Sequence, residues 1–472
     1  MSNFQLNGVN PQKCFIIHKQ DIEQRLDPFY YIPSILELEN KVRALNPKPL
    51  RYYVKHISSG ATPKTTESDK YYSDAENGVP FLRVQNLSST GELKLDECKY
   101  INWETHENYL KRSQVSGGDL LVKITGVGRM AVASVAPEGF VGNTNQHMVV
   151  IKTESREVSE ILAAYLNTDI GEALASRRAT GGTRPALDYP ALLSIPIIYD
   201  KKILEIHREA IKIKKEKEAA AKALLESIDT YLLNELGIQL PKIENDLDKR
   251  IFTVNFSEIT HQRLDPDYNI KIKLLDKLHW KYKPIEVGKL IEKSPQYGAN
   301  EIAVEPVSDD FTRYIRITDI REDGTLKSTG SKTAVKIEKQ YLLNYNDILF
   351  ARSGSVGRCY IHKEVEQKAI FAGYLIRFIL DEKKINPDYF FYYCQSSIYK
   401  FWVSAIERPA VQSNINSEEY KSLKIPLPPI SKQEEIVKYI SNIRSKAKKL
   451  QNEAMETLQN AKFEVEKMIL GK

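Results

Sequence analysis

The sequence predicts an α+β protein made of two copies of one unit, each copy a β-rich, mixed α/β globule followed by a long helix. Three observations predict this fold class. Short motifs from the first half of the chain return in the same order about 230 residues later. Short apolar runs broken by Gly, Pro, Asn and Ser fill the first part of each copy, which is typical of strands and turns. A helical apolar pattern closes each copy.

The repeat is carried by motif pairs that keep their order along the chain. The clearest is Gln-Arg-Leu-Asp-Pro, which begins at residue 24 and again at residue 262. Collinear matches of this kind do not arise by chance, and the small shifts in spacing between them indicate loop insertions. The pairs are 24–30 with 262–268, 81–87 with 314–320, 118–122 with 346–350, 127–129 with 356–358 and 194–197 with 424–427.

Composition excludes several classes of protein. The four cysteines form no Cys-x-x-Cys pair, so neither a disulfide framework nor a zinc knuckle is indicated. No apolar run approaches the roughly 18 residues of a membrane span, and the first residues lack the basic and apolar regions of a signal peptide. We therefore expect a cytoplasmic protein with no membrane partner. The net charge of +6 is weak evidence for an anionic partner, because it is spread over 472 residues.

Hydrophobic patterning sets the expected domains. In the first copy it predicts strands within 79–87, 119–124, 131–135 and 147–151. The helical part of each copy begins after an Ile-Pro motif, because proline ends the extended segment. The expected domains are 1–199 for an N-terminal segment and the first globule, 200–238 for a central spacer helix, 239–253 for a linker, 254–430 for the second globule and 431–472 for a distal spacer helix.

The two long helices are expected to pair with each other. Apolar residues recur at steps of three and four in both, in the same phase, with Lys217 and Glu235 as polar exceptions. One such helix would suggest only a core face with a solvated back, but two in equivalent places favour pairing. Related by pseudo-twofold symmetry, they would form an antiparallel coiled coil about 50 Å long. The positions expected in this pairing are Ile206, Ala210, Ile213, Leu224, Ile228, Ile436, Ile440, Ile443, Leu450 and Leu458.

Two similar globules on a rigid helical spacer would act as a two-point ruler. A DNA duplex repeats about every 34–36 Å, so globules that far apart can reach successive major grooves along one side. A small-molecule enzyme has no obvious use for such a shape. The architecture therefore favours double-stranded DNA with a bipartite site as the partner.

Loops of the first globule suit this partner. The segment 59–66 is polar and basic, the segment 143–147 carries amides that can pair with adenine edges, and 177–184 combines arginines with flexible glycines. For each loop the alternative is a solvated surface turn. The candidate DNA-binding residues are Thr62, Lys64, Tyr71, Tyr72, Arg129, Asn143, Asn145, Gln146, Arg177, Arg178, Thr183 and Arg184.

The second globule carries different side chains at the corresponding places. Its loops lie within 295–300, 352–358 and 407–414. Different loops on a shared framework predict that the two globules read two different sequences. The candidate DNA-binding residues here are Gln296, Tyr297, Arg352, Ser353, Ser355, Arg358, Arg408, Gln412 and Asn414.

Catalytic motifs fail on inspection. The run Gly-Val-Gly-Arg-Met-Ala at 126–131 matches a dinucleotide fingerprint, but a strand ended by proline follows it where the fingerprint needs a helix. A tight hairpin turn is the better interpretation. The chain holds no Walker loop, no Asn-Pro-Pro-aromatic methyltransferase signature, no His-Glu-x-x-His and no Gly-x-Ser-x-Gly. We expect a non-catalytic chain with no catalytic residue, no metal site and no cofactor of its own.

Three motifs carry a family resemblance. They are Ser-Gly-Ala-Thr-Pro at 59–63, Asn-Asp-Ile-Leu-Phe-Ala-Arg-Ser-Gly-Ser-Val-Gly-Arg at 346–358 and Ile-Pro-Leu-Pro-Pro-Ile-Ser-Lys-Gln-Glu at 425–434. With the two-unit order, the chain resembles the DNA specificity subunit of type I restriction-modification systems over nearly its whole length. The first copy departs from the pattern, since 118–126 lacks Ala-Arg-Ser and 195–198 lacks the double proline.

The resemblance implies a division of labour. Each globule would be a target recognition domain that reads one half of an asymmetric, bipartite DNA site. The paired helices would hold the domains apart and dock methyltransferase subunits. S-adenosylmethionine, ATP and Mg would belong to partner chains, which include motor and restriction subunits.

Three other hypotheses stay open at the level of sequence. The chain is alternatively the recognition subunit of a methyltransferase-only modification system, which would lack a motor-nuclease partner on co-purification. An enzyme using the turn at 126–131 would bind a dinucleotide. A purely structural coiled-coil protein would show no preference for a specific duplex over random DNA.

Overall fold

The structure, a computed structural model, contains two compact units. The first unit comprises residues 1–218 and 451–472, and the second unit comprises 219–450. The long helices α6 (Lys201–Leu236) and α13 (Ile430–Ile469) each contribute one part to each unit. The structure describes residues 10, 13–23, 25–96, 98–241, 253, 263–364, 366–407 and 413–471.

A four-stranded antiparallel sheet lies in the core of each unit, with the same strand order in both: β2–β10–β7–β8 in the first and β13–β20–β17–β18 in the second. The strands β7 and β17 are buried at every position, because each is an apolar run flanked by two other strands. The bounds are β2 (His56–Ser59), β7 (Leu120–Lys123), β8 (Ala133–Val135) and β10 (Met148–Lys152), then β13 (Ile291–Tyr297), β17 (Ile348–Ala351), β18 (Cys359–Ile361) and β20 (Leu375–Leu380).

The remaining strands are partly shared between the units. Each unit has a parallel pair, β4–β9 or β15–β19, and a short antiparallel pair, β1–β11 or β12–β21. In the first unit β4 and β9 belong to a five-stranded sheet of order β3–β5–β4–β9–β6, whereas the second unit has a separate pair, β14–β16. The bounds are β1 (Lys48–Pro49), β3 (Tyr72–Ser73), β4 (Val79–Leu82), β5 (Lys99–Ile101), β6 (Gln114–Ser116), β9 (Val141–Thr144), β11 (Pro196–Ile197), β12 (Pro284–Glu286), β14 (Ala303–Val304), β15 (Arg313–Ile315), β16 (Thr333–Ala334), β19 (Ala369–Phe371) and β21 (Lys424–Pro426).

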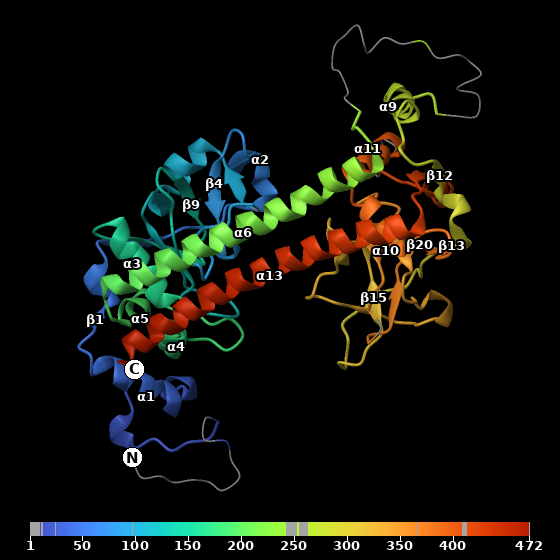
Figure 1. The fold of residues 1–472 in the computed structure, drawn as a ribbon. Helices are drawn as coiled ribbons and strands as arrows, with labels where there is room; N and C mark the ends of the chain where they lie inside the picture. Colours follow the sequence, from blue (N-terminus) through green and yellow to red (C-terminus); the bar gives the residue numbers. More distant parts are fainter. Residues whose placement is uncertain are drawn as a thin grey trace. The chain divides into compact units, whose positions relative to one another are not determined.

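Short helices follow the sheets in equivalent order. Most begin at a side chain that accepts a backbone N–H bond, such as Ser155, Thr168 and Asp188 in the first unit and Asn386 and Ser396 in the second. Figure 1 shows α3, α4 and α5 in the first unit and α10 and α11 in the second. The bounds are α1 (Pro33–Arg43), α2 (Ser68–Tyr71), α3 (Arg156–Leu166), α4 (Asp169–Arg178) and α5 (Tyr189–Leu193), then α9 (Pro266–Asp276), α10 (Pro387–Tyr393), α11 (Ser397–Ile406) and α12 (Ser417–Lys421).

In the first unit the beginning of α6 packs against the end of α13. Ile203 of α6 is buried in one apolar cluster with Val465 and Ile469 of α13, and this cluster also holds the apolar face of α3. Lys217 forms an ion pair with Glu453 at 2.5 Å. Since an early part of one helix meets a late part of the other, the pairing is antiparallel.

In the second unit the end of α6 packs against the beginning of α13. Leu232 and Leu236 share a core cluster with Ile436 and Ile440, to which α10 and α11 also contribute. The rings of Tyr231 and Tyr439 stack with centroids 3.9 Å apart. A second ion pair joins Glu235 to Lys432 at 2.8 Å. This pairing is also antiparallel.

These findings confirm the predicted fold class, a duplicated β-rich unit with paired long helices. Four of the positions expected in the pairing are buried: Ala210, Ile436, Ile440 and Ile443. The other six are half-buried: Ile206, Ile213, Leu224, Ile228, Leu450 and Leu458. Strands lie in each of the four ranges expected in the first globule. The domain boundaries stay a prediction, and most of the expected linker, 239–253, lies outside the described residues.

The repeated Arg-Leu-Asp-Pro motif clamps the end of a helix in the first unit. Arg25 donates to the backbone oxygens of Arg178 at 2.8 Å and Ala179 at 3.0 Å, where α4 ends. Asp27 holds the Arg25 guanidinium at 2.8 Å and accepts from the backbone N–H of Tyr30 at 3.2 Å. The arginine thus satisfies carbonyls that a helix terminus leaves without partners.

The second copy of the motif makes the same contacts in the second unit. Arg263 donates to the backbone oxygens of Ile406 at 2.5 Å and Glu407 at 3.4 Å, where α11 ends. Asp265 holds Arg263 at 2.8 Å and caps Tyr268 at 3.0 Å. The motif that revealed the duplication is therefore structural in both units.

Candidate nucleic-acid interface

In the first unit, two loops expected to contact DNA lie together. The hydroxyl of Thr62, after β2, donates to the amide oxygen of Gln146, before β10, at 2.5 Å across 84 residues of sequence. Thr62, Lys64 and Gln146 are all exposed. The Thr62–Gln146 pair can present hydroxyl and amide groups to a base edge, while Lys64 is placed to meet a phosphate.

A glycine makes this approach possible. A Cβ atom on Gly60 would lie 1.7 Å from the carbonyl oxygen of Thr144, so a side chain cannot be accommodated there without moving the backbone. The second unit repeats this packing after β13, where a Cβ on Gly298 would lie 2.3 Å from the carbonyl oxygen of Ala372. The same close approach brings equivalent loops together in both units.

The expectation that Asn143 and Asn145 offer amides to adenine is wrong for their placement in this structure, because both are buried. Asn143 lies on β9, with its Oδ1 2.5 Å from Nδ1 of His106, and its amide donates to the backbone oxygen of Leu110 at 2.9 Å. The Asn145 Oδ1 accepts from the backbone N–H of His147 at 3.1 Å. Both amides hold the loop that carries Gln146.

Arg177 and Arg178 do not lie on an exposed loop, which corrects the sequence prediction. They end α4 and are buried against Glu39, which contacts Arg178 at 2.7 Å and also accepts from Arg177. Burial alone would raise the pKa of the Glu39 carboxyl, but the hydrogen bonds and charges of the two arginines outweigh it and lower that pKa to about 2. Thr183 and Arg184, on the loop after α4, are exposed as expected.

The two candidate tyrosines of the first unit play different parts. Tyr72 is half-buried, and its hydroxyl donates to the backbone oxygen of Pro63 at 2.9 Å, which holds the loop of Thr62. The ring of Tyr71 lies 5.3 Å from that of Tyr109. Tyr109 and Trp103, which sequence reasoning missed, are more than half exposed. They come from a segment without a glycine, and the basic pair Lys111-Arg112 beside Tyr109 is the sequence signal that could have marked them.

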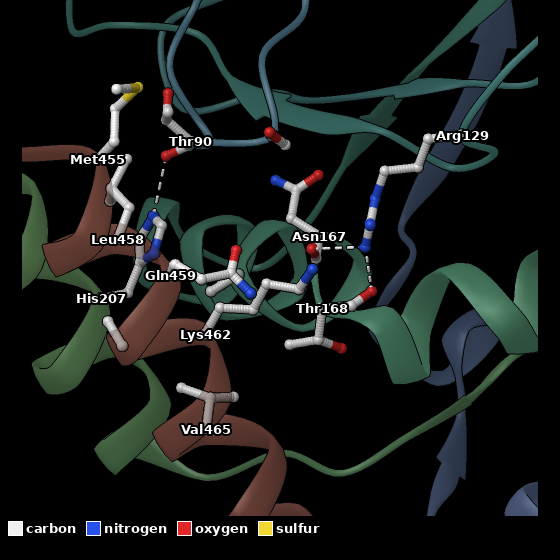
Figure 2. Close-up of a pocket in the computed structure, with 13 residues that line it drawn as sticks. Thr90, Arg129, Asn167, Thr168, His207, Met455, Leu458, Gln459, Lys462 and Val465 are labelled. Atoms are coloured by element: carbon white, nitrogen blue, oxygen red, sulfur yellow. Dashed lines mark hydrogen bonds between the residues drawn. The ribbon is translucent and has the colours of Figure 1, made fainter. Parts of the chain in front are cut away.

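Arg129 is directed toward α4 and α13 rather than toward the loop of Thr62. Its guanidinium donates to the backbone oxygen of Asn167 at 2.7 Å and to the carboxylate of Asp169 at 2.8 Å. Lys462 of α13 also pairs with Asp169. Figure 2 shows Arg129 and Lys462 converging on this helix end, beside a cavity of about 140 Å³ that His207 also lines. These contacts tie the turn to the helices.

The turn that carries Arg129 joins two antiparallel strands, β7 and β8. The prediction of a hairpin is therefore confirmed, but residues 124–132 separate the two strands, so the turn is not tight. A dinucleotide fingerprint requires a helix directly after its glycines, and β8 occupies that place. The enzyme hypothesis based on this turn loses its structural basis.

In the second unit the candidate loops also converge. The Arg352 guanidinium lies 4.8 Å from the ring centroid of Tyr297, a cation–π contact. Ser353 forms an antiparallel bridge with Asn414. The Tyr297 hydroxyl lies 3.3 Å from Ser417 Oγ. Three chain segments thereby meet at one surface.

Other candidates of the second unit have structural partners. The Gln296 amide oxygen accepts from Arg377, and Arg358 donates to the backbone oxygen of Ile320 at 2.8 Å. Ser355 is half-buried and lines a cavity considered below. Arg408 and Gln412 lie outside the described residues.

The equivalent surfaces differ in their side chains. Asn300 occupies the place of Thr62, two residues after the tightly packed glycine. Asn145 donates its backbone N–H to the carbonyl oxygen of Leu82 on β4, and Ala372 donates its own to that of Ile315 on β15. Because these two residues are equivalent, the residues that follow them, Gln146 and Gly373, occupy equivalent places. A polar pair in the first unit is thus replaced by an asparagine beside a glycine.

Comparison with known proteins identifies the class to which this surface belongs. Residues 285–460 match the model of the type I restriction modification DNA specificity domain. This segment is therefore similar to a DNA specificity domain of that family. The description of this family names DNA specificity and no reaction, in line with the expectation of a non-catalytic chain.

Individual relatives agree with this class. The chain is 28% identical over 179 residues to the MjaX type I restriction enzyme specificity subunit of Methanocaldococcus jannaschii, covering 36% of this chain and 38% of the relative. It is 25% identical over 160 residues to the EcoBI specificity subunit of Escherichia coli, covering 33% of this chain and 34% of the relative. The alignments span little more than a third of either relative. The predicted resemblance to specificity subunits is confirmed.

Solved structures with a similar chain trace include the HsdS subunit from Thermoanaerobacter tengcongensis, at 13% identity and a TM-score of 0.32, covering 90% of this chain and 95% of that chain. The S subunit of a type I system from M. genitalium has 12% identity and a TM-score of 0.36, covering 90% and 94%.

The part of the chain that the structure describes offers neither a metal site nor a membrane-spanning helix. No group of three or more His, Cys, Asp or Glu side chains there is arranged to hold a metal ion. No described helix combines the length and apolarity that a membrane crossing needs.

Proposed function

We propose that this chain is a DNA specificity subunit that reads a bipartite, asymmetric double-stranded site through two target recognition domains held apart by the paired helices. It docks methyltransferase subunits, together with motor and restriction subunits, in the cytoplasm. S-adenosylmethionine, ATP and Mg are held by those partner chains, and this chain contributes recognition alone.

The two units share one backbone arrangement at the candidate surface but present different side chains there, and this observation carries the proposal. Gly60 and Gly298 make the same close approach in the two units. The residues presented beside them are Thr62 with Gln146 in one unit and Asn300 with Gly373 in the other. A duplication kept for stability alone has no need of such divergence at exposed positions. Divergence is what two different half-sites require, because base edges are distinguished by the donors and acceptors they meet.

Charge at the two surfaces fits a division between phosphate and base contacts. Lys64 and Arg184 are exposed in the first unit and can pair with phosphates, which position a protein on the duplex without reading sequence. The buried Arg177, Arg178, Asn143 and Asn145 take no part in the proposed contact.

The helices support the spacer role by their length. The helix α6 has 36 residues and α13 has 40. At about 1.5 Å per residue these correspond to roughly 54 and 60 Å of helix, more than one turn of duplex. Within each unit, apolar contacts and one ion pair join the two helices.

The test is to express the chain with its methyltransferase subunits and to map which sequences become methylated. We expect an asymmetric site with two defined halves and an undefined spacer. Thr62→Ala should alter one half, and Asn300→Ala should alter the other. If both variants change the same half, independent reading by the two units is refuted. Co-purification without a motor-nuclease chain would indicate a methyltransferase-only system.

The spacer is tested separately. Deleting one heptad from α6 and the equivalent heptad from α13 keeps the seam in phase and shortens each helix by about 10 Å. We expect both half-sites to be retained with a spacer shorter by about three base pairs. An unchanged spacer would contradict the ruler role, while half-site reading would still stand.

A further inference from the structure

An apolar cavity opens on the candidate DNA surface of the second unit. Its volume is about 560 Å³, and its apolar lining includes Ala299, Ala303, Ile317, Ala372 and Tyr374. Its polar lining includes Asn300, Glu301, Thr318, Ser353, Ser355 and Arg316, whose guanidinium is paired with Asp319. Ser353 and Ser355 are candidate DNA-binding residues, and Asn300 lies in the candidate loop 295–300. The lining is dominated by methyl, methylene and ring groups, which is unusual for a surface that otherwise meets a polar polymer.

The cavity exists because of a glycine. Gly373 stands where the first unit has Gln146, so no side chain fills the space beside the loop of Asn300. A Cβ on Gly373 would lie 2.0 Å from Oδ1 of Asn300, which shows that the amide rests directly over the glycine at the cavity edge. In the first unit the same place is filled by the Thr62–Gln146 pair.

The groups that a duplex offers restrict what this cavity can take. The grooves of DNA display hydrogen-bond donors and acceptors at almost every position, and the apolar group among them is the C5-methyl of thymine in the major groove. On the same base pair, adenine presents N7 and N6, which an asparagine amide contacts bidentately. An apolar cavity with an asparagine at its edge therefore matches both bases of one A·T pair.

We infer that the second unit reads A·T pairs, an inference that rests on the proposed function. Its cavity takes thymine methyl groups, and Asn300 contacts the adenine. The volume exceeds that of one methyl group, so neighbouring thymines can enter together. The first unit, whose equivalent place is polar and filled, makes hydrogen bonds there instead.

The test begins with duplexes selected from a random pool by the full chain. Each thymine of the selected site is then replaced by deoxyuridine, which removes the methyl group and leaves pairing intact. Burial of one such carbon is worth about a fourfold change in Kd. We expect a loss of that size at one or more positions of one half-site only.

Three variants assign the effect to the cavity. Ala303→Leu fills it and should abolish the difference between thymine and deoxyuridine. Gly373→Ala displaces the flexible end of Asn300 and should cost about tenfold in Kd at the same half-site, with reduced sensitivity to 7-deazaadenine. Ile302→Ala is the matched control, because Ile302 is 73% exposed and does not line the cavity, so its discrimination should equal that of the unmodified chain.

The outcomes separate the two levels of the proposal. A selected sequence that tolerates deoxyuridine at every position overturns the A·T inference and leaves the proposed function standing. So does a methyl effect that persists unchanged in both Ala303→Leu and Gly373→Ala. If the pool yields no preferred sequence, the proposed function itself fails.

Discussion

The carboxylate of Glu39 accepts a hydrogen bond from Arg178 at 2.7 Å inside the first unit, although 139 residues separate the two in sequence. Arg177 shares the same carboxylate, and all three side chains are buried. Because Arg25 also holds the end of α4, this cluster fixes where the exposed loop with Arg184 begins. The placement of this exposed loop therefore depends on a buried ion cluster.

Removing the shared carboxylate should be costly. Glu39→Gln leaves two buried guanidinium groups without their counter-charge, which typically destabilises a protein by about 3–5 kcal/mol. We expect a loss of this size in urea unfolding followed by circular dichroism. The matched control is Glu37→Gln on the same helix, whose ion pair with Lys41 is exposed and should contribute under about 0.5 kcal/mol. Equal effects of the two substitutions would contradict the buried cluster.

The same carboxylate predicts an acid dependence. The pKa of Glu39 falls from an ordinary 4.5 to about 2 on folding, so its stabilisation is complete above pH 4.5 and is lost as pH falls toward 2. The difference corresponds to about 3 kcal/mol. The gap in unfolding free energy between the natural chain and Glu39→Gln should therefore shrink steadily below pH 4.5. A gap that stays constant from pH 6 to pH 2.5 would show that Glu39 does not titrate in this way.

The cross-helix ion pairs should stabilise the helix pairing. Lys217→Glu places a negative charge against Glu453 and should lower the unfolding free energy by about 1 kcal/mol, as should Glu453→Lys alone. Combining the two restores the pair with its charges exchanged, so the double variant should recover most of the loss. A double-mutant cycle in urea gives the coupling energy, and a value near zero would assign the pairing to the apolar seam alone.

The close-approach glycines should act on recognition one unit at a time. Gly60→Ala forces the loop of Thr62 away from β9, and Gly298→Ala does the same beside β19. Methylation mapping should show each substitution relaxing a different half-site. Glu37→Ala is a suitable control for both, because Glu37 lies on α1, its side chain is 69% exposed and it is none of the candidate DNA-binding residues. Loss of both half-sites from either substitution would mean that the units do not read independently.

Periodic features could be predicted from the sequence, because they are local and repeated. The seam residues Ile436 and Ile440 are buried as their spacing indicated. The same spacing marks Lys217 and Glu235 as polar residues at apolar positions. It does not predict their ion-pair partners, Glu453 and Lys432, because neither partner occupies a position of the apolar repeat.

Long-range pairing explains most of what could not be predicted. Arg177 and Arg178 precede a glycine-rich run and have the composition of a phosphate-binding loop, yet their partner Glu39 lies on a distant helix. Asn143 was misplaced for the same reason, since His106 is remote in sequence. Composition indicates which groups are polar, and the fold decides which of them face solvent.

The clamps formed by Arg25 and Arg263 have a consequence for how such a chain can change over time. Each holds the last carbonyls of a helix, immediately before a loop that differs between the two copies. The point at which the variable stretch leaves the scaffold is thereby anchored by residues outside that stretch. Exchanging the residues that follow either helix would leave the anchor itself intact, because Arg25 and Arg263 both precede their helices by more than 130 residues in sequence.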